Sequence, residues 1–237
     1  MKTYESNPVI LEKIIPMNAQ LFTAVDEYIN TLFAPEDPAL IAARDTIARS
    51  GIPDASISAS QGSFLHLMSR LVRATRILEL GTFGGYSTIW LARALGDHGR
   101  LITIEANPIH AELAKTNLEQ AGLADRVDLR VGKGLDLLPE LEAEAAGPFD
   151  LVFIDADKPP YAEYFQWALR LSRPGTLLIF DNVVREGKVL DPSSDDPAVQ
   201  GVRRLNQALA TEPRVCATIL ANVGIKKYDG MAIALVL

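Results

Sequence analysis

The sequence predicts an α/β fold built on a doubly wound, mostly parallel seven-stranded sheet, with helices ahead of it and an antiparallel strand pair at its end. Short apolar runs alternate with helical stretches from Arg76 onward, which is typical of right-handed βαβ crossovers over a parallel sheet. Two closing apolar runs are joined by a connection too short for a crossover helix, so they should pair antiparallel. With 237 residues, 48% of them hydrophobic and 22% charged, the chain can bury one large core.

The N-terminal part of the chain predicts three helices. Apolar residues recur at helical spacing over residues 21–50, and the pattern breaks where Asp37 or Pro38 can begin a second helix. After a polar stretch, residues 61–72 again carry apolar side chains at helical intervals. This third helix should lead directly into the first strand of the sheet.

Seven apolar runs are the expected strands. The first five should be parallel and cover residues 77–80, 101–104, 127–131, 151–154 and 176–180. The last two, residues 215–220 and 231–237, are joined through a connection that contains glycine and lysine over residues 224–230. We expect a single domain, in which a helical extension over residues 1–56 precedes a core over residues 57–237.

Charge and cysteine content argue against several classes of partner. The 23 Lys and Arg residues against 30 Asp and Glu give a formal net charge of −7, so no overall basic surface favours nucleic acid or an anionic membrane. The single Cys216 rules out an intramolecular disulfide, and its apolar neighbours predict a buried strand position. No run reaches the ~18 apolar residues of a membrane span, and charges are scattered through residues 1–16. We expect a cytoplasmic protein without nucleic-acid or membrane partners.

A glycine-rich turn follows the first expected strand. Ligands of doubly wound sheets bind beyond the carboxyl ends of the strands, so this turn is a candidate site. It reads Glu-Leu-Gly-Thr-Phe-Gly-Gly-Tyr-Ser over residues 79–87 and leads into a helix. Glycines let the backbone turn tightly and approach a ligand closely. A tight turn that binds nothing is the alternative for such a cluster taken alone.

An acid at the end of the second strand narrows the kind of ligand. Glu105 is placed to accept hydrogen bonds from both hydroxyls of a ribose. The glycine spacing is not the dinucleotide G-x-G-x-x-G, and Glu79, two residues before the turn, would oppose a pyrophosphate but suit a cationic or zwitterionic ligand. S-adenosylmethionine is therefore favoured over NAD. An NAD-dependent oxidoreductase is the rival interpretation, because a glycine-rich turn and a second-strand acid are common to both classes.

Three oxygen donors at neighbouring strand ends indicate a metal site. Asp155 follows the fourth strand, and Asp181 and Asn182 follow the fifth. Such hard ligands suit Mg²⁺, with Mn²⁺ or Ca²⁺ as alternatives. Strand-end Asp and Asn residues also cap loops and helices, which is the competing interpretation for either position alone. The histidines share no metal-binding spacing, and the aromatic residues after Pro160 are spaced as for a core; they are His66, His98, His110, Tyr164, Phe165 and Trp167.

Three stretches of the chain resemble a known family. Residues 77–95, the segment FDLVFIDADKPPY over residues 149–161, and FDNVVREGKV over residues 180–189 are similar to the cation-dependent O-methyltransferases related to caffeoyl-CoA and catechol O-methyltransferases. The likeness runs from about residue 57 to the last residue, and the closing Val-Gly and Tyr-Asp-Gly resemble the smaller bacterial members. The resemblance implies a Rossmann-like methyltransferase fold and methyl transfer from S-adenosylmethionine to a hydroxyl of a catechol-like or other vicinal-diol phenol.

The resemblance also implies roles for individual positions around the cofactor. Positions of the family that surround the methionine portion of the cofactor match Glu79, Gly81, Phe83 and Ser87. The ribose-binding acid matches Glu105, and positions around the adenine match Gly134 and Ala156. Relatives often carry an acid in a Gly-Asp-Ala sequence near the adenine, where this chain has Lys133.

The metal, the catalytic base and the acceptor are assigned in the same way. Asp155, Asp181 and Asn182 match the three metal ligands, and Asp155 also lies near the sulfonium in relatives. The lysine proposed as general base matches Lys158, for which a salt bridge with Asp157 or another exposed acid is the alternative. Positions that shape the acceptor pocket match Ile57, Ser58 and Arg185.

Arg185 is a departure from the plant enzymes, which have an aromatic residue after the Asp-Asn pair, so a coenzyme A thioester acceptor is not implied. A solvated loop cation and an anion-binding residue are equally open interpretations of this arginine. The N-terminal helices and the habit of relatives suggest a homodimer. A binding module that kept the cofactor pocket without the chemistry is a further alternative.

Overall fold

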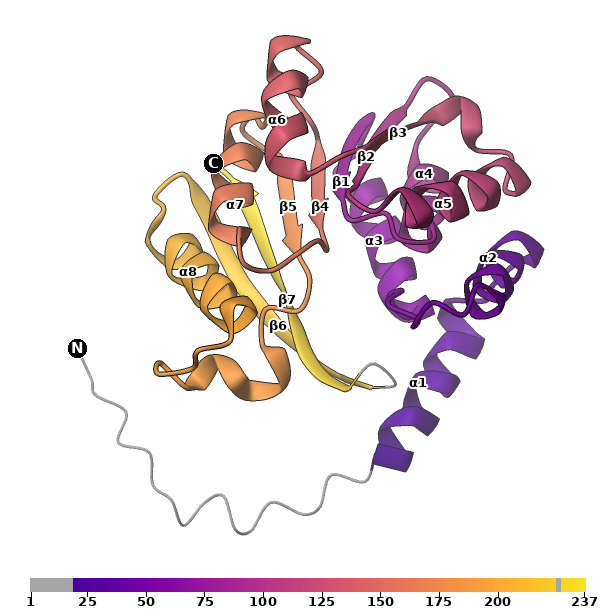
Figure 1. Ribbon diagram of the computed structural model, residues 1–237, viewed down its shortest axis with the longest axis horizontal. Coiled ribbons are helices and arrows are strands. Elements are labelled where there is room, and N and C mark those ends of the chain that lie inside the picture. Colours follow the sequence, from indigo (N-terminus) through magenta and orange to yellow (C-terminus); the bar gives the residue numbers. More distant parts are fainter. Residues whose placement is uncertain (1–18, 225–226) are drawn as a thin grey trace.

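A seven-stranded sheet forms the centre of the computed structural model, which describes residues 19–224 and 227–237 (Figure 1). Its strands are β1 Arg76–Leu80, β2 Arg100–Glu105, β3 Val127–Val131, β4 Leu151–Ile154, β5 Leu177–Phe180, β6 Val215–Gly224 and β7 Lys227–Val236. They lie side by side in the order β3-β2-β1-β4-β5-β7-β6. The first five are parallel, as predicted, and their carboxyl ends therefore meet at one edge of the sheet.

The C-terminal strands pair antiparallel, which confirms the expected hairpin, but they extend beyond the predicted runs. Strand β7 also pairs antiparallel with β5. The register of the hairpin includes Leu220 opposite Met231 and Asn222 opposite Asp229, so most of the expected connection is strand. The added positions include Asn222 and Asp229, and such polar residues interrupt an apolar run, so a search for apolar runs ended the strands too early.

The prediction that Cys216 is buried is wrong. Cys216 is exposed, whereas its neighbour Val215 packs into the core. Successive side chains of a strand point to opposite faces, and β6 lies at the edge of the sheet with β7 as its neighbour. After Val215, residues 216–220 of this edge strand are all exposed.

Eight α-helices and two short 3₁₀ segments occupy the described residues. The helices are α1 Ala19–Phe33, α2 Pro38–Arg49, α3 Ala59–Leu71, α4 Tyr86–Ala94, α5 Pro108–Gln120, α6 Gly134–Ala143, α7 Tyr161–Arg170 and α8 Pro197–Thr211; the 3₁₀ segments are η2 Ala124–Arg126 and η3 Arg185–Leu190. Asp37 caps α2 by accepting a hydrogen bond from the Leu40 N–H, and Pro38 opens the helix, as predicted. Helix α3 begins two residues earlier than predicted because Ser58 and Gln61 form a capping box.

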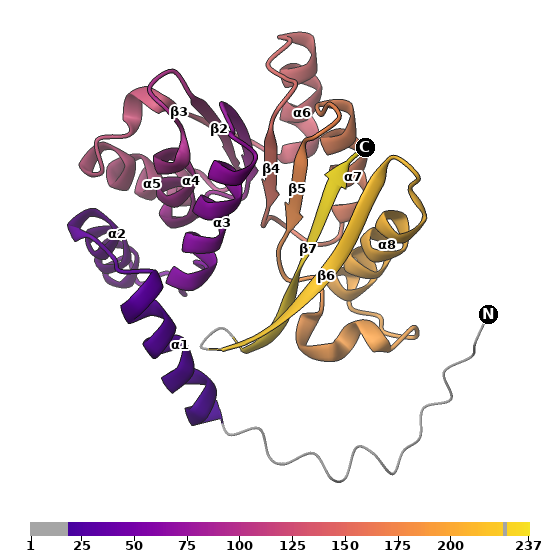
Figure 2. The ribbon, with the colours of Figure 1, turned by 180° about the vertical axis from the view of Figure 1, so that it is seen from behind.

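The core has two halves, one on each face of the sheet. Side chains of α3, α4 and α5 pack with Ile77 on one face, and those of α6, α7 and α8 pack with Leu78 on the other. Figures 1 and 2 show the two helical layers from opposite sides. Alternate residues of β1 therefore point to opposite layers, which confirms the doubly wound arrangement.

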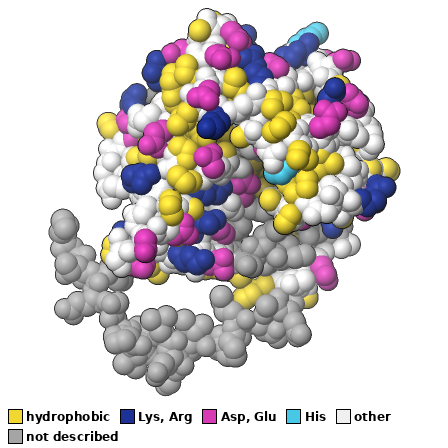
Figure 3. Space-filling model, in the orientation of Figure 1, with side chains coloured by type: hydrophobic (Ala, Val, Ile, Leu, Met, Phe, Trp, Pro, Cys, Tyr) yellow, Lys and Arg dark blue, Asp and Glu magenta, His cyan; other side chains and the backbone are white. Residues whose placement is uncertain are grey.

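The surface mixes charges of both signs. Figure 3 shows Lys and Arg side chains interspersed with Asp and Glu over the face seen in Figure 1. Helix α1 presents an apolar stripe to solvent at helical spacing, through Leu21, Val25, Tyr28 and Leu32. Among the described residues, no helix combines the length and apolar character that crossing a bilayer requires.

Candidate functional site

A cavity of about 850 Å³ opens at the carboxyl ends of β1, β2 and β4. It lies where a doubly wound sheet binds its ligands. The cavity brings together many of the residues singled out from the sequence: Ile57, Gly81, Phe83, Ser87, Glu105, Gly134, Asp155, Ala156, Lys158 and Asn182. Four others lie outside the lining formed by the described residues: Ser58, Glu79, Asp181 and Arg185.

The glycine-rich turn forms one wall of the cavity. Gly81 has φ +94°, and a Cβ added there would lie 2.1 Å from the carbonyl oxygen of Asp155. Only glycine fits at this crossing of the β1 and β4 strand ends. Gly85, with φ +79°, forms the N-cap of α4, so the helix begins directly after the turn.

Glu79 supports the turn from beneath instead of facing the cavity. Its buried carboxylate accepts hydrogen bonds from three hydroxyls, at 2.6 Å from Ser87 Oγ, 2.6 Å from Thr88 Oγ1 and 2.7 Å from Thr103 Oγ1. Burial raises the pKa of Glu79 to about 7, although the three hydroxyl donors act in the opposite direction. Ser87 lines the cavity, so Glu79 fixes the position of a cavity residue; its assignment to the cofactor stays a prediction.

Glu105 holds the turn from the other side. Its carboxylate accepts hydrogen bonds from the backbone N–H groups of Thr82 at 3.1 Å, Phe83 at 2.8 Å and Asn107 at 2.8 Å. His110 lies 3.6 Å from Glu105 through Nδ1, and its ring packs edge-on against Phe83 with centroids 4.9 Å apart. Glu105 therefore orders the loop and also lines the cavity, where a carboxylate can accept further hydrogen bonds from a ribose.

Lys158 is held at the far wall of the cavity. Its Nζ donates to Asp155 Oδ1 at 2.7 Å and to the hydroxyl of Tyr161 at 2.5 Å, and Lys158 is 8% exposed. The alternative was a salt bridge with Asp157 or another exposed acid; Lys158 does form a salt bridge, but with the half-buried Asp155, whereas Asp157 accepts from the hydroxyl of Tyr164. Helix α8 braces this segment from behind: a Cβ at Gly201 would lie 2.1 Å from the Lys158 carbonyl oxygen.

Asp181 and Asn182 stand beside Asp155. Asp181 is 2% exposed, and burial together with the nearby charge of Asp155 raises its pKa. The N–H of Asn182 donates to Asp181 Oδ1 at 2.8 Å, and Gln61 Nε2 lies 3.5 Å from Oδ2. Two carboxylates and an amide at this spot fit a hard divalent cation, whose charge would offset the repulsion that Asp181 experiences. Within the described ranges, no three His, Cys, Asp or Glu side chains gather as a metal-binding group.

Asp229 on β7 fastens the loop that carries Asp181 and Asn182. Its Oδ1 accepts from the backbone N–H groups of Val184, Arg185 and Gly230 at 3.0, 3.0 and 2.9 Å. Asn182 and Arg185 both adopt positive φ, at 57° and 55°, which this clamp stabilises. The Nε of Arg185 is buried without a hydrogen-bond partner among the described residues.

A second, smaller cavity of about 200 Å³ lies between α3 and the C-terminal hairpin. Ser58 and Gln61 line it together with Asn222. Gln61 also reaches Asp181, so the smaller cavity borders the acidic cluster. The resemblance assigns Ser58 to the acceptor pocket, and in the structure Ser58 lines this smaller cavity instead of the large one. The role of Ser58 in acceptor binding stays a prediction.

Sequence reasoning missed several residues of the site. Tyr164 and His110 were assigned no role, yet both line the large cavity. Tyr161 and Gln61 were not singled out, although they contact Lys158 and Asp181. Tyr161 and Tyr164 lie on a helix whose apolar spacing predicts core packing, so no signal in the sequence indicated a role at the site. The Ser-x-x-Gln pattern at Ser58 and Gln61 predicts only where a helix starts.

Comparisons with known proteins agree with this geometry. A family model described as O-methyltransferase matches residues 32–236. The chain is 59% identical over 220 residues to a catechol O-methyltransferase from Niastella koreensis, covering 93% of this chain and all of that protein. A catechol O-methyltransferase from Mycobacterium tuberculosis is 48% identical over 90% of this chain and 94% of its own.

Solved structures give the same result. The crystal structure of an O-methyltransferase from Bacillus cereus in complex with SAH superposes with a TM-score of 0.90 at 50% identity, over 92% of this chain and 100% of that one. The O-methyltransferase TomG from Streptomyces achromogenes, in complex with SAM, also reaches 0.90 at 50% identity, over 93% and 99%. The fold of this chain is therefore that of Rossmann-like methyltransferases.

Proposed function

The chain belongs to the O-methyltransferase family, and we propose that it transfers the methyl group of S-adenosylmethionine to a metal-chelated hydroxyl of a catechol-like or other vicinal-diol phenol. One observation carries this proposal: Lys158, fixed by Asp155, lies in the same cavity as the glycine-rich turn. The proposed base, the proposed cofactor wall and two of the three proposed metal ligands, Asp155 and Asn182, thus line one cavity. Family membership leaves the NAD-dependent oxidoreductase alternative without support.

The proposed cofactor site is the part of the cavity around the turn. Glu105 would hold the ribose, Gly81, Phe83 and Ser87 the methionine portion, and Gly134 and Ala156 the adenine; all six line the cavity. Glu79 would act indirectly, through Ser87. S-adenosylmethionine, when bound, supplies a methyl group that the adjacent sulfonium already activates. The role of the protein is to align an acceptor oxygen behind that methyl carbon, at roughly 3 Å from it.

The proposed metal ligands are Asp155, Asp181 and Asn182, with Mg²⁺ as the favoured cation. Their support is the hard donor set and the closeness of the Asp155 charge to buried Asp181. A divalent cation, when bound, would lower the pKa of a coordinated hydroxyl and fix its orientation. Lys158 in its neutral form would accept the hydroxyl proton, and Asp155 would keep its amine in place.

The acceptor would enter beside Ile57, which lines the same cavity as Lys158 and Asn182. Ser58 and Arg185 are proposed to shape its binding. The relatives named catechol O-methyltransferase support an acceptor with two neighbouring hydroxyls. Which phenol is used depends on loops that vary within a family.

The test is a turnover assay on purified, chelator-stripped protein. We would add S-adenosylmethionine and a panel of catechols, caffeic acid, caffeoyl-CoA and flavonoids, with and without Mg²⁺, and measure S-adenosylhomocysteine release. Turnover that requires the metal and vicinal hydroxyls is expected. Turnover without metal would contradict the role of the cation, and tight S-adenosylmethionine binding without any turnover would indicate a binding module or an acceptor of another class.

We further propose a cytoplasmic homodimer. The support for the dimer is the exposed apolar stripe of α1 at Leu21, Val25, Tyr28 and Leu32, which a second copy would cover. Light scattering at micromolar concentration should give twice the monomer mass, and Tyr28→Asp should halve it. A monomeric mass for the unaltered chain would contradict the dimer. The cytoplasmic location rests on the composition alone, and cell fractionation would test it.

A further inference from the structure

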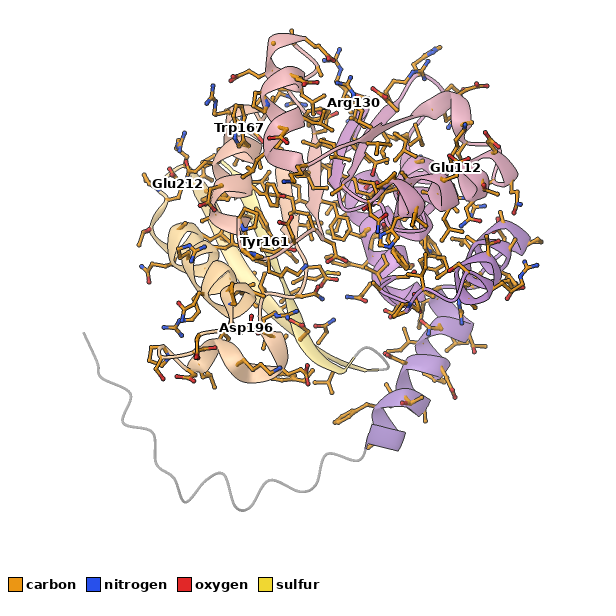
Figure 4. All side chains as sticks on the ribbon, in the orientation of Figure 1. Glu112, Arg130, Tyr161, Trp167, Asp196 and Glu212 are labelled. Atoms are coloured by element: carbon orange, nitrogen blue, oxygen red, sulfur yellow. The ribbon has the colours of Figure 1, made fainter. Side chains whose placement is uncertain are left out.

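Tyr161 is fully buried, yet its hydroxyl has three polar partners at the candidate site: Lys158 Nζ and two backbone carbonyl oxygens. It is the first residue of α7, and its side chain is 0% exposed. The hydroxyl lies 3.2 Å from the carbonyl oxygen of Ile154 and 3.2 Å from that of Asp181. Figure 4 labels Tyr161 near the lower ends of β4 and β5, where these carbonyls are found. It thus joins the ends of both strands that carry proposed metal ligands.

Counting donors and acceptors fixes the direction of the bond between Tyr161 and Lys158. Both carbonyl oxygens are acceptors, so the single phenolic hydrogen is committed to them. The hydroxyl oxygen must then accept from Lys158 Nζ, 2.5 Å away. Asp155 Oδ1, at 2.7 Å, can also only accept when ionised. Two of the hydrogens on Nζ are therefore directed at Tyr161 and Asp155.

The remaining position on Nζ is the one that matters for proton transfer. A tetrahedral nitrogen bonded to Cε and donating twice has one position left, a third hydrogen in the ammonium form or the lone pair in the neutral amine. Lys158 lines the large cavity, whereas Tyr161 lies outside the lining formed by the described residues. Tyr161 is fully buried and Asp155 is half-buried, so both hold Nζ at the wall of the cavity.

We propose that Tyr161 is a positioning residue that, together with Asp155, orients Lys158 so that the free position of Nζ faces the acceptor. This inference rests on the proposed function of Lys158 as the base. Tyr161 touches neither cofactor nor acceptor and acts through Lys158 alone. A phenol serves here because it accepts from Nζ while its own hydrogen is held by Ile154 and Asp181.

The first test is Tyr161→Phe, which removes the hydroxyl and keeps the ring. We expect kcat to fall roughly 10- to 100-fold, part of the 10²- to 10⁴-fold that a general base contributes. The KM for S-adenosylmethionine should not change, because Tyr161 does not line the cavity. An unchanged kcat, or a fall explained by a higher KM, would overturn the proposal.

Thr176→Val is the matched control for the loss of a buried hydroxyl. Thr176 Oγ1 likewise donates to a carbonyl, that of Phe149 at 2.6 Å, and accepts from the Arg173 N–H at 3.0 Å. It is 0% exposed and stands just before β5, at the opposite end of the strand from the site. This variant should lower Tm comparably to Tyr161→Phe without a change in kcat. An equal fall in kcat would mean that lost stability explains both results.

A double-mutant cycle tests whether Tyr161 acts through Lys158. In a Lys158→Met background, adding Tyr161→Phe should change kcat by less than about twofold, because the group to be oriented is gone. A further fall of about tenfold would show an independent action of the phenol and overturn the proposal.

Crystal structures provide a measurement that does not depend on turnover. In ligand-free wild type, Lys158 Nζ should stay within hydrogen-bond distance of Asp155 and Tyr161. In Tyr161→Phe, the lysine should adopt another rotamer or several. An unmoved Nζ in the variant overturns the positioning role. A displaced Nζ in a protein whose wild type has no turnover contradicts the proposed function and supports the positioning role.

Discussion

Asp229 Oδ1 lies 3.0 Å from the backbone nitrogen of Arg185, and this hydrogen bond ties β7 to the loop that begins at Asp181. The same oxygen accepts from the Val184 N–H at 3.0 Å. The loop includes Asn182 with φ +57°, a conformation that non-glycine residues rarely adopt without such support. Strand β7 therefore helps to set the geometry of the proposed metal ligands.

Asp229→Ala should weaken Mg²⁺ activation roughly 10- to 100-fold, which is typical when a residue that supports metal ligands is lost. The measurement is the Mg²⁺ concentration that gives half-maximal turnover. Asp229→Asn is the matched variant, because its carbonyl oxygen can still accept from Val184 and Arg185. It should keep most of the activation. Equal Mg²⁺ dependence in the alanine variant and the wild type would refute the clamp.

Asp181→Ala should lower kcat by about 100-fold or more and weaken metal binding as well, because the side chain is proposed to touch the cation directly. Lys158→Met should lower kcat while Mg²⁺ affinity stays close to that of wild type. Calorimetric Mg²⁺ titration beside steady-state kinetics separates the two effects. Full activity of chelator-treated Asp181→Ala would remove the metal from the mechanism.

Glu79 should make the stability of the protein depend on pH. Its pKa is raised by burial from 4.5 to about 7 in the folded chain, so the folded state binds the proton more tightly than the unfolded state. The contribution of Glu79 to stability is then fully present below about pH 4.5 and is lost as the pH rises through about 7, by about 3 kcal/mol for a shift of this size.

Denaturant unfolding of wild type and Glu79→Gln over that pH interval measures this effect. The free energy of unfolding of wild type should fall relative to the variant as the pH rises, because glutamine does not ionise. Ser87→Ala removes one of the hydroxyl donors and should enlarge the fall. A difference between wild type and Glu79→Gln that is constant with pH would show that the carboxyl does not titrate there.

Asp150 should have the opposite pH dependence. Burial raises its pKa, but hydrogen bonds from the backbone N–H groups of Thr75 and Arg76 and from Arg173 together hold the pKa below 3.8. The stabilisation is present above about pH 4 and is lost as the pH falls through the folded-state value. Asp150→Asn should cost about 2 kcal/mol at neutral pH.

Thermal and denaturant unfolding check this change, and turnover serves as its control. Asp150 stands at the amino end of β4, away from the cavity, so kcat should be unchanged. A stability difference between Asp150→Asn and wild type that persists at low pH would contradict the ionic origin of the stabilisation.

The parts of this protein that sequence could predict depend on periodicity and on strand ends. The alternation of apolar runs with helical stretches predicted the parallel sheet, and Asp155 and Asn182 lie together at its edge because parallel strands end on one side. The orientation of Glu79 could also have been predicted. Residues 77 and 79 of a strand point to the same face, and Ile77 packs against the helical layer that contains α4, where Glu79 accepts from Thr88. Strand alternation alone would have directed its carboxylate beneath the turn.

Other features depend on contacts between distant segments, which one sequence does not reveal. Tyr161 sits in a helix whose apolar spacing predicts core packing, and the ring is indeed in the core. Its hydroxyl alone contacts polar groups of the site. Those contacts depend on how closely the ends of β4 and β5, at Ile154 and Asp181, approach each other. Cys216 was misassigned because apolar neighbours predict a strand but not whether that strand lies at an edge.

The Asp229 clamp also has a consequence for biosynthesis. A chain emerging from the ribosome at about 5–20 residues per second can assemble β1 to β5 from its earlier segments. The loop from Asp181 to Arg185 acquires its fastening only after α8, β6 and the first part of β7 have followed. Nascent chains that already contain the glycine-rich turn would therefore lack an ordered loop over residues 181–185, and the arrangement proposed to bind the cation would arise last, with the closing hairpin.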